Sequence, residues 1–518
     1  MDKEVEIRVA PEELESADQH LNLVSRKLGV SSSRITQIKL KRRSIDARHN
    51  KVRFVLRYLV GVDAPLSKPD VVGRSFRPVH NERPVAVVGA GPAGLFAALR
   101  LIELGLKPII IERGKAVRER RKDIANVSKG LSVDPDSNYC FGEGGAGTFS
   151  DGKLYTRATK RGDVVRILQT LVDNGAAPDI LIDAHPHIGT NKLPAVIESI
   201  RRTILEFGGE ILFGERVQGF ELKAGRLAAL STNSGLRIEG AAVILATGHS
   251  ARDIFSALRE LNITLEAKPF ALGVRVEHPQ GLIDQVQYGK SPRHHCLPAA
   301  SYSLKAQADN RGVFSFCMCP GGVICPAATS DGEIVVNGWS PSKRNSHFAN
   351  SGIVVEVSVD DLLAYGSDKV FAGIELQMAN EQRSFRAGGG GLKAPAQRLC
   401  DFVEGKVSQS LPRCSYNPGT TSCEIGDVLD VGIVSRLREG FLTFGKDVRG
   451  YLTNEAIVVA TESRTSSPIK IPRGADSLMH PEVDGLFPCG EGAGYAGGIM
   501  SAAIDGERVA QAVKKYFS

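Results

Sequence analysis

Three glycines and one glutamate in the first quarter of the chain have the types and the spacing of a dinucleotide-binding site. Gly89, Gly91 and Gly94 form a GxGxxG pattern, and Glu112 follows Gly91 by 21 residues. The first glycine allows a tight turn, the second lets the backbone approach a pyrophosphate, and the third lets a helix pack closely on a strand. A carboxylate at Glu112 can accept hydrogen bonds from a ribose diol. Neighbouring residues predicted to belong to the same site are Pro92, Ala93 and Arg113.

A second group of small residues follows in the middle of the chain. Residues 141–155 hold five glycines within twelve positions, which excludes a stable helix or central strand. Such a loop can bring several backbone N–H groups close to a flat or anionic ligand. Further on, a buried strand is predicted to end in small residues that let it pass close to an adenine-ribose edge. The site residues predicted from these two segments are Gly145, Ala146, Gly147, Thr148, Ala246, Thr247 and Gly248.

A third glycine-rich turn lies near the other end of the chain. Residues 485–490 predict a strand and a turn that ends in Gly490, and Glu491 is an acid in that turn. Gly497 and Gly498 then precede a helix that begins near Ile499. A helix N-terminus offers free N–H groups and a positive dipole end to an anionic ligand. A site built from both ends of a chain requires them to meet, so we predict one domain into which the intervening region is inserted.

Several side chains are candidates for catalysis or substrate anchoring. His249 directly follows the second motif, although a histidine of the surface or cap is an alternative interpretation. Arg464 lies in a Ser/Thr-rich turn, where it could clamp a substrate carboxylate bidentately or pair with a structural acid. Arg386, beside a glycine loop, is a candidate of the same kind, as is Arg275.

The cysteines predict reduced thiols and no metal site. Nine cysteines are scattered through a long chain. Cys317, Cys319 and Cys325 have a CxCx5C spacing, whereas zinc and iron–sulfur sites prefer CxxC spacings with four ligands. Thiols packed in a loop near the ligand are the favoured interpretation, and a redox-active thiol pair and a metal site are the alternatives. We therefore predict no bound metal.

Charge and composition favour a large globular protein without a membrane span. At 518 residues the chain needs two or three domains, and 42% hydrophobic with 24% charged residues allows a sizeable core. No run of 18 apolar residues occurs, and residues 1–10 alternate charged with apolar positions, so we expect a cytoplasmic location. Residues 1–80 hold 16 Lys+Arg against 10 Asp+Glu, which carries +6 of the net charge of +7. This basic module is either a nucleic-acid surface or a solvated or docked face of a small sheet, and the second interpretation is favoured.

Four segments are needed to position these residues. Residues 1–80 predict a small basic α+β module with a linker, and residues 81–267 predict the first part of a dinucleotide-binding domain, built from a strand at 84–88, a helix and a strand at 109–111. Residues 268–459 are rich in short strands and turns and predict a substrate or cap domain. Residues 460–518 predict the C-terminal part of the dinucleotide-binding domain. No second GxGxxG flanked by a strand and a helix occurs, so a dedicated NAD(P)H domain is not predicted.

Together these motifs resemble the glutathione-reductase-type FAD-binding fold. The resemblance implies that Glu491 contacts the ribitol chain, that the backbone at Gly498 and Ile499 points at the isoalloxazine carbonyl, and that the loop at 145–148 lies along the flavin. The implied fold class is α/β: a glutathione-reductase-type FAD-binding Rossmann domain, an inserted mixed α+β substrate or cap domain, and a small ferredoxin-like α+β module at the N-terminus. A finer match, covering essentially the whole chain, is to FAD-dependent dehydrogenases once described as NAD(FAD)-utilising dehydrogenases. Residues 141–154, 314–322 and 462–473 carry it, with the basic module.

The resemblance implies an FAD-dependent oxidoreductase that acts on a small organic substrate by hydride transfer at flavin N5. NAD(P)H could bind transiently at the flavin face as a reductant. The alternative function is an FAD-containing RNA-modification or RNA-associated protein that uses the basic module at residues 1–80.

Overall fold

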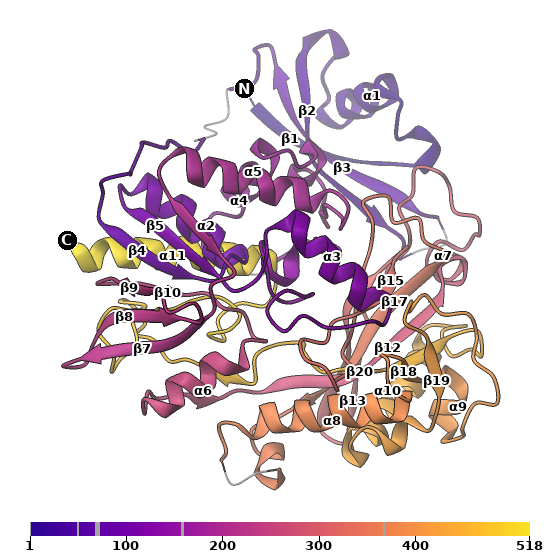
Figure 1. The fold of residues 1–518 in the computed structure, drawn as a ribbon. Helices are drawn as coiled ribbons and strands as arrows, with labels where there is room; N and C mark the ends of the chain where they lie inside the picture. Colours follow the sequence, from indigo (N-terminus) through magenta and orange to yellow (C-terminus); the bar gives the residue numbers. More distant parts are fainter. Residues whose placement is uncertain (1, 49–50, 68–72, 157–159, 366–367) are drawn as a thin grey trace.

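The computed structural model describes residues 2–48, 51–67, 73–156, 160–365 and 368–518. They form a small N-terminal module, a central α/β domain and a β-rich domain (Figure 1). Part of the expected linker, at 68–72, lies outside the described residues. Among the helices of the described ranges, none is long and apolar enough to cross a membrane. The expectation of a cytoplasmic location stays a prediction.

The N-terminal module is a three-stranded antiparallel sheet with one α-helix. Its strands have the order β1 (Asp2–Val9), β3 (Arg53–Val62) and β2 (Ile35–Asp46), and α1 (Ala17–Leu28) packs on β1. A ferredoxin-like module would add a second helix and a fourth strand. Within the described residues, the chain leaves β3 and enters the linker instead, so the ferredoxin-like detail of the prediction is wrong.

A five-stranded parallel sheet forms the centre of the α/β domain. The strand order is β22 (Leu486–Pro488), β10 (Val243–Leu245), β4 (Pro84–Val88), β5 (Lys107–Glu112) and β6 (Glu210–Phe213). The two ends of the chain therefore meet in one sheet, since β22 from the C-terminal part lies beside β10. Such a sheet is covered on both faces, which explains its continuous apolar strands.

Helices cover one face of this sheet and an antiparallel meander covers the other. Helices α2 (Pro92–Glu103) and α11 (Ile499–Phe517) pack against each other on the first face (Figure 1). The meander consists of β7 (Val217–Lys223), β8 (Arg226–Thr232) and β9 (Arg237–Glu239), and its apolar side chains share a core with β4, β5 and β10. Both covering helices begin at the carboxyl edge of the sheet, which is where ligands bind in open α/β sheets.

The β-rich domain is built on a seven-stranded mixed sheet with the order β13-β14-β17-β12-β20-β18-β19. Its central strands are β14 (Arg311–Cys319), β17 (Phe348–Val357), β12 (Phe270–Pro279) and β20 (Ile457–Glu462). The edge strands are β13 (Lys305–Ala308) and β19 (Thr420–Ser422), and β18 (Ala394–Arg398) lies between β20 and β19. Helix α10 (Val431–Asp447) packs on one face, and α8 (Ala372–Gly388) contacts β18 and β20. A two-stranded ribbon, β15 (Val323–Pro326) with β16 (Val336–Trp339), lies against this sheet.

Strand β20 runs past the domain boundary expected at residue 459. Its last two residues, Thr461 and Glu462, are polar. Both are nevertheless buried, because Thr461 Oγ1 lies 2.6 Å from Ser384 Oγ and Glu462 accepts a hydrogen bond of 2.7 Å from Arg275. The β-rich domain therefore extends at least to Glu462.

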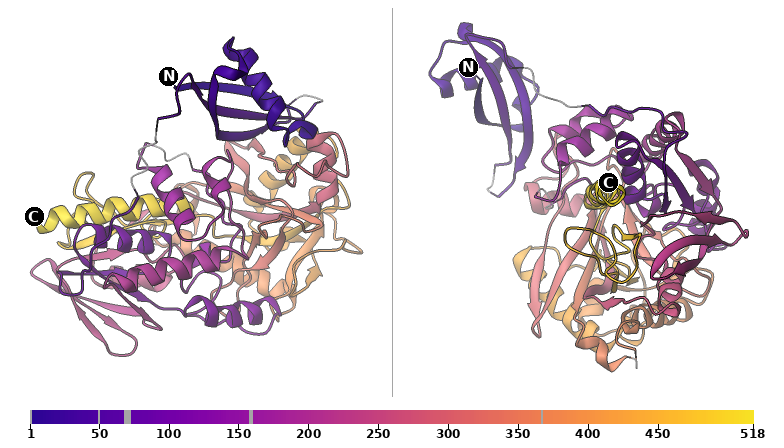
Figure 2. Two further views of the ribbon diagram at one scale, coloured as in Figure 1. Left: turned by 90° about the horizontal axis from the view of Figure 1, so that it is seen from above. Right: turned by 90° about the vertical axis from the view of Figure 1, so that its left-hand side faces the viewer.

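The N-terminal module is docked on the rest of the molecule along one edge (Figure 2). Arg43 of β2 donates to Asp183 at 2.8 Å and to Asp179 at 2.9 Å. Leu297, from the β-rich domain, is buried in the core of the module. At Arg43 the basic surface of the module is therefore a docked face.

Candidate cofactor and substrate site

A cavity of about 660 Å³ lies where the carboxyl ends of β4, β5 and β10 face the β-rich domain. Most residues predicted from the sequence line it, and the predicted candidates that do so are Gly89, Gly91, Pro92, Ala93, Glu112, Arg113, Gly145, Ala146, Gly147, Ala246, Thr247, Gly248, His249, Arg464, Glu491, Gly497, Gly498 and Ile499. Gly94, Thr148, Gly490 and Arg386 are absent from the lining. The cavity brings together segments from both ends of the chain.

Three predicted residues do not line the cavity but hold the backbone segments that do. A Cβ atom on Gly94 would lie 1.9 Å from the Gly89 carbonyl oxygen, so this glycine allows α2 to approach β4. Thr148 Oγ1 donates to the Glu143 carbonyl at 2.7 Å and closes the glycine loop. The Gly490 N–H donates to Asp505 at 2.9 Å. These residues shape the backbone that faces the cavity.

The acid of the first motif is held by backbone donors. Glu112 is buried and accepts hydrogen bonds from the N–H groups of Ala90 at 2.8 Å, Gly114 at 2.9 Å and Gly142 at 3.0 Å. Among the described residues, Oε2 accepts only the bond from Ala90, and a carboxylate oxygen can accept two. The remaining lone pair suits a ribose hydroxyl. The same carboxylate fixes the glycine loop, since it holds Gly142.

The third motif places the N-terminus of α11 at the cavity. Gly498 precedes the helix with a φ of +134°, a value that L side chains rarely adopt. Glu491 accepts a hydrogen bond from the Gly498 N–H. Behind it, Arg473 pairs with Asp505 at 2.7 and 3.0 Å, which holds the turn that carries Glu491. The first N–H groups of α11 have no intrahelical acceptors and are available to an anion or a carbonyl.

Arg120 is a supporting residue that sequence reasoning missed. It lies on α3 (Val117–Ser128), is fully buried, and donates to the carbonyl oxygens of Asn138, Tyr139 and Glu143 at 2.8–2.9 Å. Burial lowers its pKa to about 10, which leaves it charged at neutral pH. These three bonds fix the loop that leads into the glycines at the cavity. Arg120 shares the buried face of α3 with Val117 and Val127, and that spacing is the signal that could have found it.

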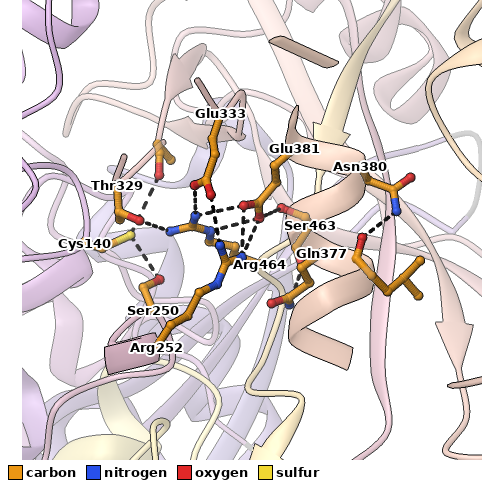
Figure 3. Close-up of polar contacts among 12 residues, drawn as sticks. Cys140, Ser250, Arg252, Thr329, Glu333, Gln377, Asn380, Glu381, Ser463 and Arg464 are labelled. Carbon is orange, nitrogen blue, oxygen red and sulfur yellow. Dashed lines mark hydrogen bonds and ion pairs between the residues drawn. The ribbon is translucent and has the colours of Figure 1, made fainter. Parts of the chain in front are cut away.

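Arg464 pairs with structural acids, which is one of the two roles considered for it (Figure 3). Its guanidinium donates to Glu333 at 2.9 Å, to Glu381 at 3.0 and 3.1 Å, and to Thr329 at 2.6 Å. Arg252 binds the same two acids. Burial opposes ionisation of Glu381, but the two arginines outweigh it and lower its pKa to about 2. Two arginines and two glutamates thus form a buried, charge-balanced network at the cavity wall.

This network corrects the prediction that Arg464 clamps a substrate. Its three guanidinium nitrogens all have protein partners, so a substrate carboxylate would have to displace a buried acid. Removing one partner of such a network leaves an uncompensated buried charge. The structure therefore favours a role for Arg464 in holding α8, β20 and the wall of the cavity together.

The other two predicted catalytic residues differ in position. His249 lines the cavity, and its Nε2 lies 3.7 Å from Glu491 Oε2. Burial lowers the pKa of His249, so its imidazole is neutral at neutral pH. Arg386 is exposed at the end of α8 and does not line the cavity, so its predicted catalytic role is wrong. Arg275, also considered, is fully buried and pairs with Glu462 at 2.7 Å and Asn350 at 2.7 Å.

The wall opposite the nucleotide motifs comes from the β-rich domain and from the end of the glycine loop. Phe314, Phe316 and Cys317 of β14 line it together with Lys153. Cys317 has a φ of +44° where β14 shifts register against β17, and its thiol faces the cavity. Protein atoms around the cavity raise the pKa of this thiol to about 11, so it is protonated at neutral pH. Cys319, two residues on, is buried.

Three side chains that could bind a metal lie close together at one place in the described residues. Among the described residues, His294, His295 and Cys296 place ligand atoms within 4.8 Å of one another. Cys317, Cys319 and Cys325 form no comparable group with other ligands there. The prediction of no bound metal stays a prediction.

The lining fits FAD because several glycines leave room where a side chain would intrude. A Cβ on Gly91 would have its nearest neighbour at 3.9 Å, and a Cβ on Gly248, Gly497 or Gly498 would meet nothing within 4 Å. These open positions face one cavity, which also holds the buried acid Glu112 and two helix N-termini. An adenosine ribose, a pyrophosphate and a flat ring system each find the groups that bind them.

Family comparisons agree with this geometry. A model described as FAD binding domain matches residues 82–128, and one described as FAD-dependent protein, C-terminal domain-like, matches residues 269–465. A domain of unknown function matches residues 1–61. The fold, the cavity and these matches define the chain as an FAD-dependent oxidoreductase.

The chain belongs to the same family as an uncharacterized protein of Clostridium beijerinckii. The two sequences are 40% identical over 526 residues, which cover 97% of each chain.

Solved flavoprotein structures are similar at low identity. Glycine oxidase from Geobacillus kaustophilus is 12% identical with a TM-score of 0.38, over 85% of this chain and 95% of that chain. The flavin-dependent brominase Bmp2 is 11% identical with a TM-score of 0.35, over 83% and 78%. CtdE in complex with FAD is 12% identical with a TM-score of 0.34, over 83% and 84%.

Proposed function

We propose that the chain is a dehydrogenase or reductase that transfers a hydride between FAD and a small organic substrate. One observation supports this most directly. The cavity is continuous from Glu112, past the N-termini of α2 and α11, to the wall formed by β14. It therefore connects the residues assigned to the cofactor with a wall of the β-rich domain, where we place the substrate. When bound, FAD would supply the hydride chemistry at its flavin ring.

The proposal includes a glutathione-reductase-type arrangement of the site. Glu112 would hold the adenosine ribose, the N-terminus of α2 the pyrophosphate, and Glu491 the ribitol chain. The N-terminus of α11, beginning at Ile499, would stabilise negative charge on the flavin. Gly147, whose Cβ would lie 3.3 Å from Ile499, places the glycine loop at the same end of the cavity.

The chain's own side chains would orient the substrate and keep water out. Phe314 and Phe316 present apolar rings to the cavity. His249, neutral because burial lowers its pKa, can accept a proton at a ring nitrogen. The proposal also includes NAD(P)H as a transient reductant at the same cavity and a cytoplasmic location.

The arrangement of the basic module gives little support to an RNA-associated function. Several of its cations pair with acids on the module itself, including Lys41 with Glu4 at 2.5 Å and Arg57 with Glu6 at 3.4 Å. Arg43 is used in docking. Ion pairs within the protein reduce the charge that remains available to phosphates.

The test is to purify the protein and measure its flavin content. We expect a yellow protein that releases about one FAD per chain on denaturation, and a flavin absorbance that bleaches when NADH, NADPH or a member of a metabolite panel is added without oxygen. A protein that neither retains FAD nor binds added FAD would contradict the proposal. Bound FAD that no reductant bleaches would limit the protein to a non-catalytic role.

A further inference from the structure

Two cations share one carboxylate beside the β14 wall of the cavity. Asp151 Oδ2 lies 2.7 Å from the Arg344 guanidinium and 3.5 Å from Lys153 Nζ. The Asp151 side chain is only 4% exposed. Lys153 Nζ lies 3.5 Å from Cys319 Sγ, and the residue lines the cavity. Arg344 makes the closer contact with Asp151, so Lys153 interacts with this carboxylate more weakly.

The charges around this group leave an excess of one positive charge. Arg275 and Glu462 form a buried pair that balances itself. Asp151 neutralises one of its two cations. His187, which faces the group, has its pKa lowered by burial and by Arg344, so it stays neutral. The Lys153 side chain is 35% exposed, so a ligand anion in the cavity can approach its ammonium group.

The other acids that line the cavity have other partners, and Glu215 accepts hydrogen bonds from Thr232 and Ser234. Glu112 is engaged by three N–H groups, and Asp253 pairs with Arg113 at 3.0 Å. Glu491 accepts from Gly498. Glu356 also lines the cavity, but its side chain is exposed, where water screens its charge.

Burial does not remove the proton from Lys153. Burial alone would lower its pKa, but Cys319 and Asp151 outweigh it and raise the pKa above the usual value for lysine. An ammonium group offers three donors. Cys319 Sγ is a poor acceptor, so donor capacity remains on the cavity side.

Two aromatic side chains of β14 line the same cavity as Lys153. Phe314 and Phe316 alternate on one face of β14 and both line the cavity, and the register shift after Phe316 turns Cys317 toward the cavity as well. A single cation next to aromatic rings is the combination that binds an organic anion with an apolar body.

We infer that Lys153 binds the carboxylate of an organic acid whose apolar portion packs against Phe314 and Phe316. This inference rests on the proposed function and names the substrate class of that site. A carboxylate bound there would give Lys153 a charge-assisted hydrogen bond and would balance the cluster of Asp151, Lys153 and Arg344.

The experiment uses two probes of the same shape with different charge. Benzoate and benzamide are titrated into the FAD-loaded protein, and each dissociation constant is read from the perturbation of the flavin absorbance. We expect Lys153→Met to weaken benzoate binding by roughly tenfold or more, which corresponds to loss of one charge-assisted bond, and to leave benzamide binding nearly unchanged. Lys153→Arg should recover most of the benzoate affinity.

The control is Lys122→Met, which removes an exposed lysine of α3 outside the cavity. It should change neither dissociation constant. The inference is overturned if benzoate fails to perturb the wild-type flavin at its solubility limit, or if Lys153→Met weakens both probes equally. FAD content is measured for every variant. A wild-type protein without FAD contradicts the proposed function, whereas normal FAD content without charge discrimination contradicts only the role of Lys153.

Discussion

We expect Gly91 to be required for FAD binding but not for the stability of the cofactor-free protein. Its backbone has a φ of −74°, which any residue adopts, and a Cβ there would meet no protein atom closer than 3.9 Å. An alanine should therefore leave the stability of the cofactor-free protein unchanged. The added methyl would point into the space assigned to the pyrophosphate. We expect Gly91→Ala to weaken FAD binding at least tenfold, measured by flavin fluorescence on titration of the cofactor-free protein.

Gly73→Ala is the matched control for this prediction. A Cβ on Gly73 also meets nothing within 4 Å, and this residue does not line the cavity. It should leave both FAD affinity and Tm unchanged. If Gly91→Ala and Gly73→Ala bound FAD equally well, the pyrophosphate would not lie beside Gly91. The open space at the glycines would then no longer support an FAD site.

Individual residues were predictable where their role depends on near neighbours in the sequence. Gly89, Gly91 and Glu112 act through local backbone geometry, so their spacing was sufficient to place them at the cavity. Arg464 was ambiguous because its partners Glu333 and Glu381 lie 131 and 83 positions away. Ion pairs of that sequence separation have no spacing signal. The same holds for the contact of Lys153 with Cys319, which lies 166 positions away in the β-rich domain.

At the scale of elements, the contact between α2 and α11 connects the two ends of the site. A Cβ on Gly506 would lie 2.1 Å from the Ala93 carbonyl oxygen, so the helices touch through this glycine. We expect Gly506→Ala to force the helices apart, to destabilise the protein by about 1–3 kcal/mol, and to weaken FAD binding because both helix N-termini line the cavity. Thermal unfolding and FAD titration measure the two effects.

Gly432→Ala provides the comparison within another helix. A Cβ on Gly432, in α10, would make an ordinary 3.5 Å contact with Arg436. Replacing a helical glycine with alanine at such a site usually raises stability by up to about 1 kcal/mol. An unchanged Tm and FAD affinity in Gly506→Ala would show that the helix contact tolerates a methyl group and would contradict its proposed role.

The elements of the α/β domain were easier to predict than those of the β-rich domain. Strand, helix and strand follow one another within residues 84–112, and parallel strands buried on both faces have continuous apolar runs. In the β-rich domain, β12 pairs with β17 and with β20, which come from distant parts of the chain. Short strands and turns indicated the class of this domain, but no local pattern specifies such pairings.

For the whole molecule, the sequence predicted that residues 81–267 and 460–518 lie together, and β22 of the second segment pairs with β10 of the first. The position of the N-terminal module was not predictable. Its excess charge suggested either a partner surface or a docked face, and the choice depends on Asp179 and Asp183, which lie more than 130 positions from Arg43. Charge counts alone do not show where the opposite charges lie.

Glu277 makes the stability of the molecule depend on pH. Burial raises the pKa of this carboxyl to about 7 from a usual value of 4.5, although hydrogen bonds from Ser415 oppose the shift. Between pH 4.5 and 7 the folded protein therefore holds a proton that the unfolded chain has released. Stability falls as pH rises through this window, and the total loss is on the order of 3 kcal/mol.

Glu277→Gln should remove this dependence, because the amide is neutral at every pH. We expect the variant and the wild type to unfold at similar temperatures near pH 4.5, and the Tm of the variant to exceed that of the wild type by several degrees at pH 8. Glu119→Gln, on the exposed side of α3, should show a difference from the wild type that does not change with pH. A constant Tm difference between Glu277→Gln and the wild type across this range would mean that Glu277 is ionised in the folded protein. A charged carboxylate would then hold the buried contact between β12 and the loop at Ser415. The hydrogen bonds that the N–H and hydroxyl of Ser415 donate to it would have to offset the cost of burying its charge.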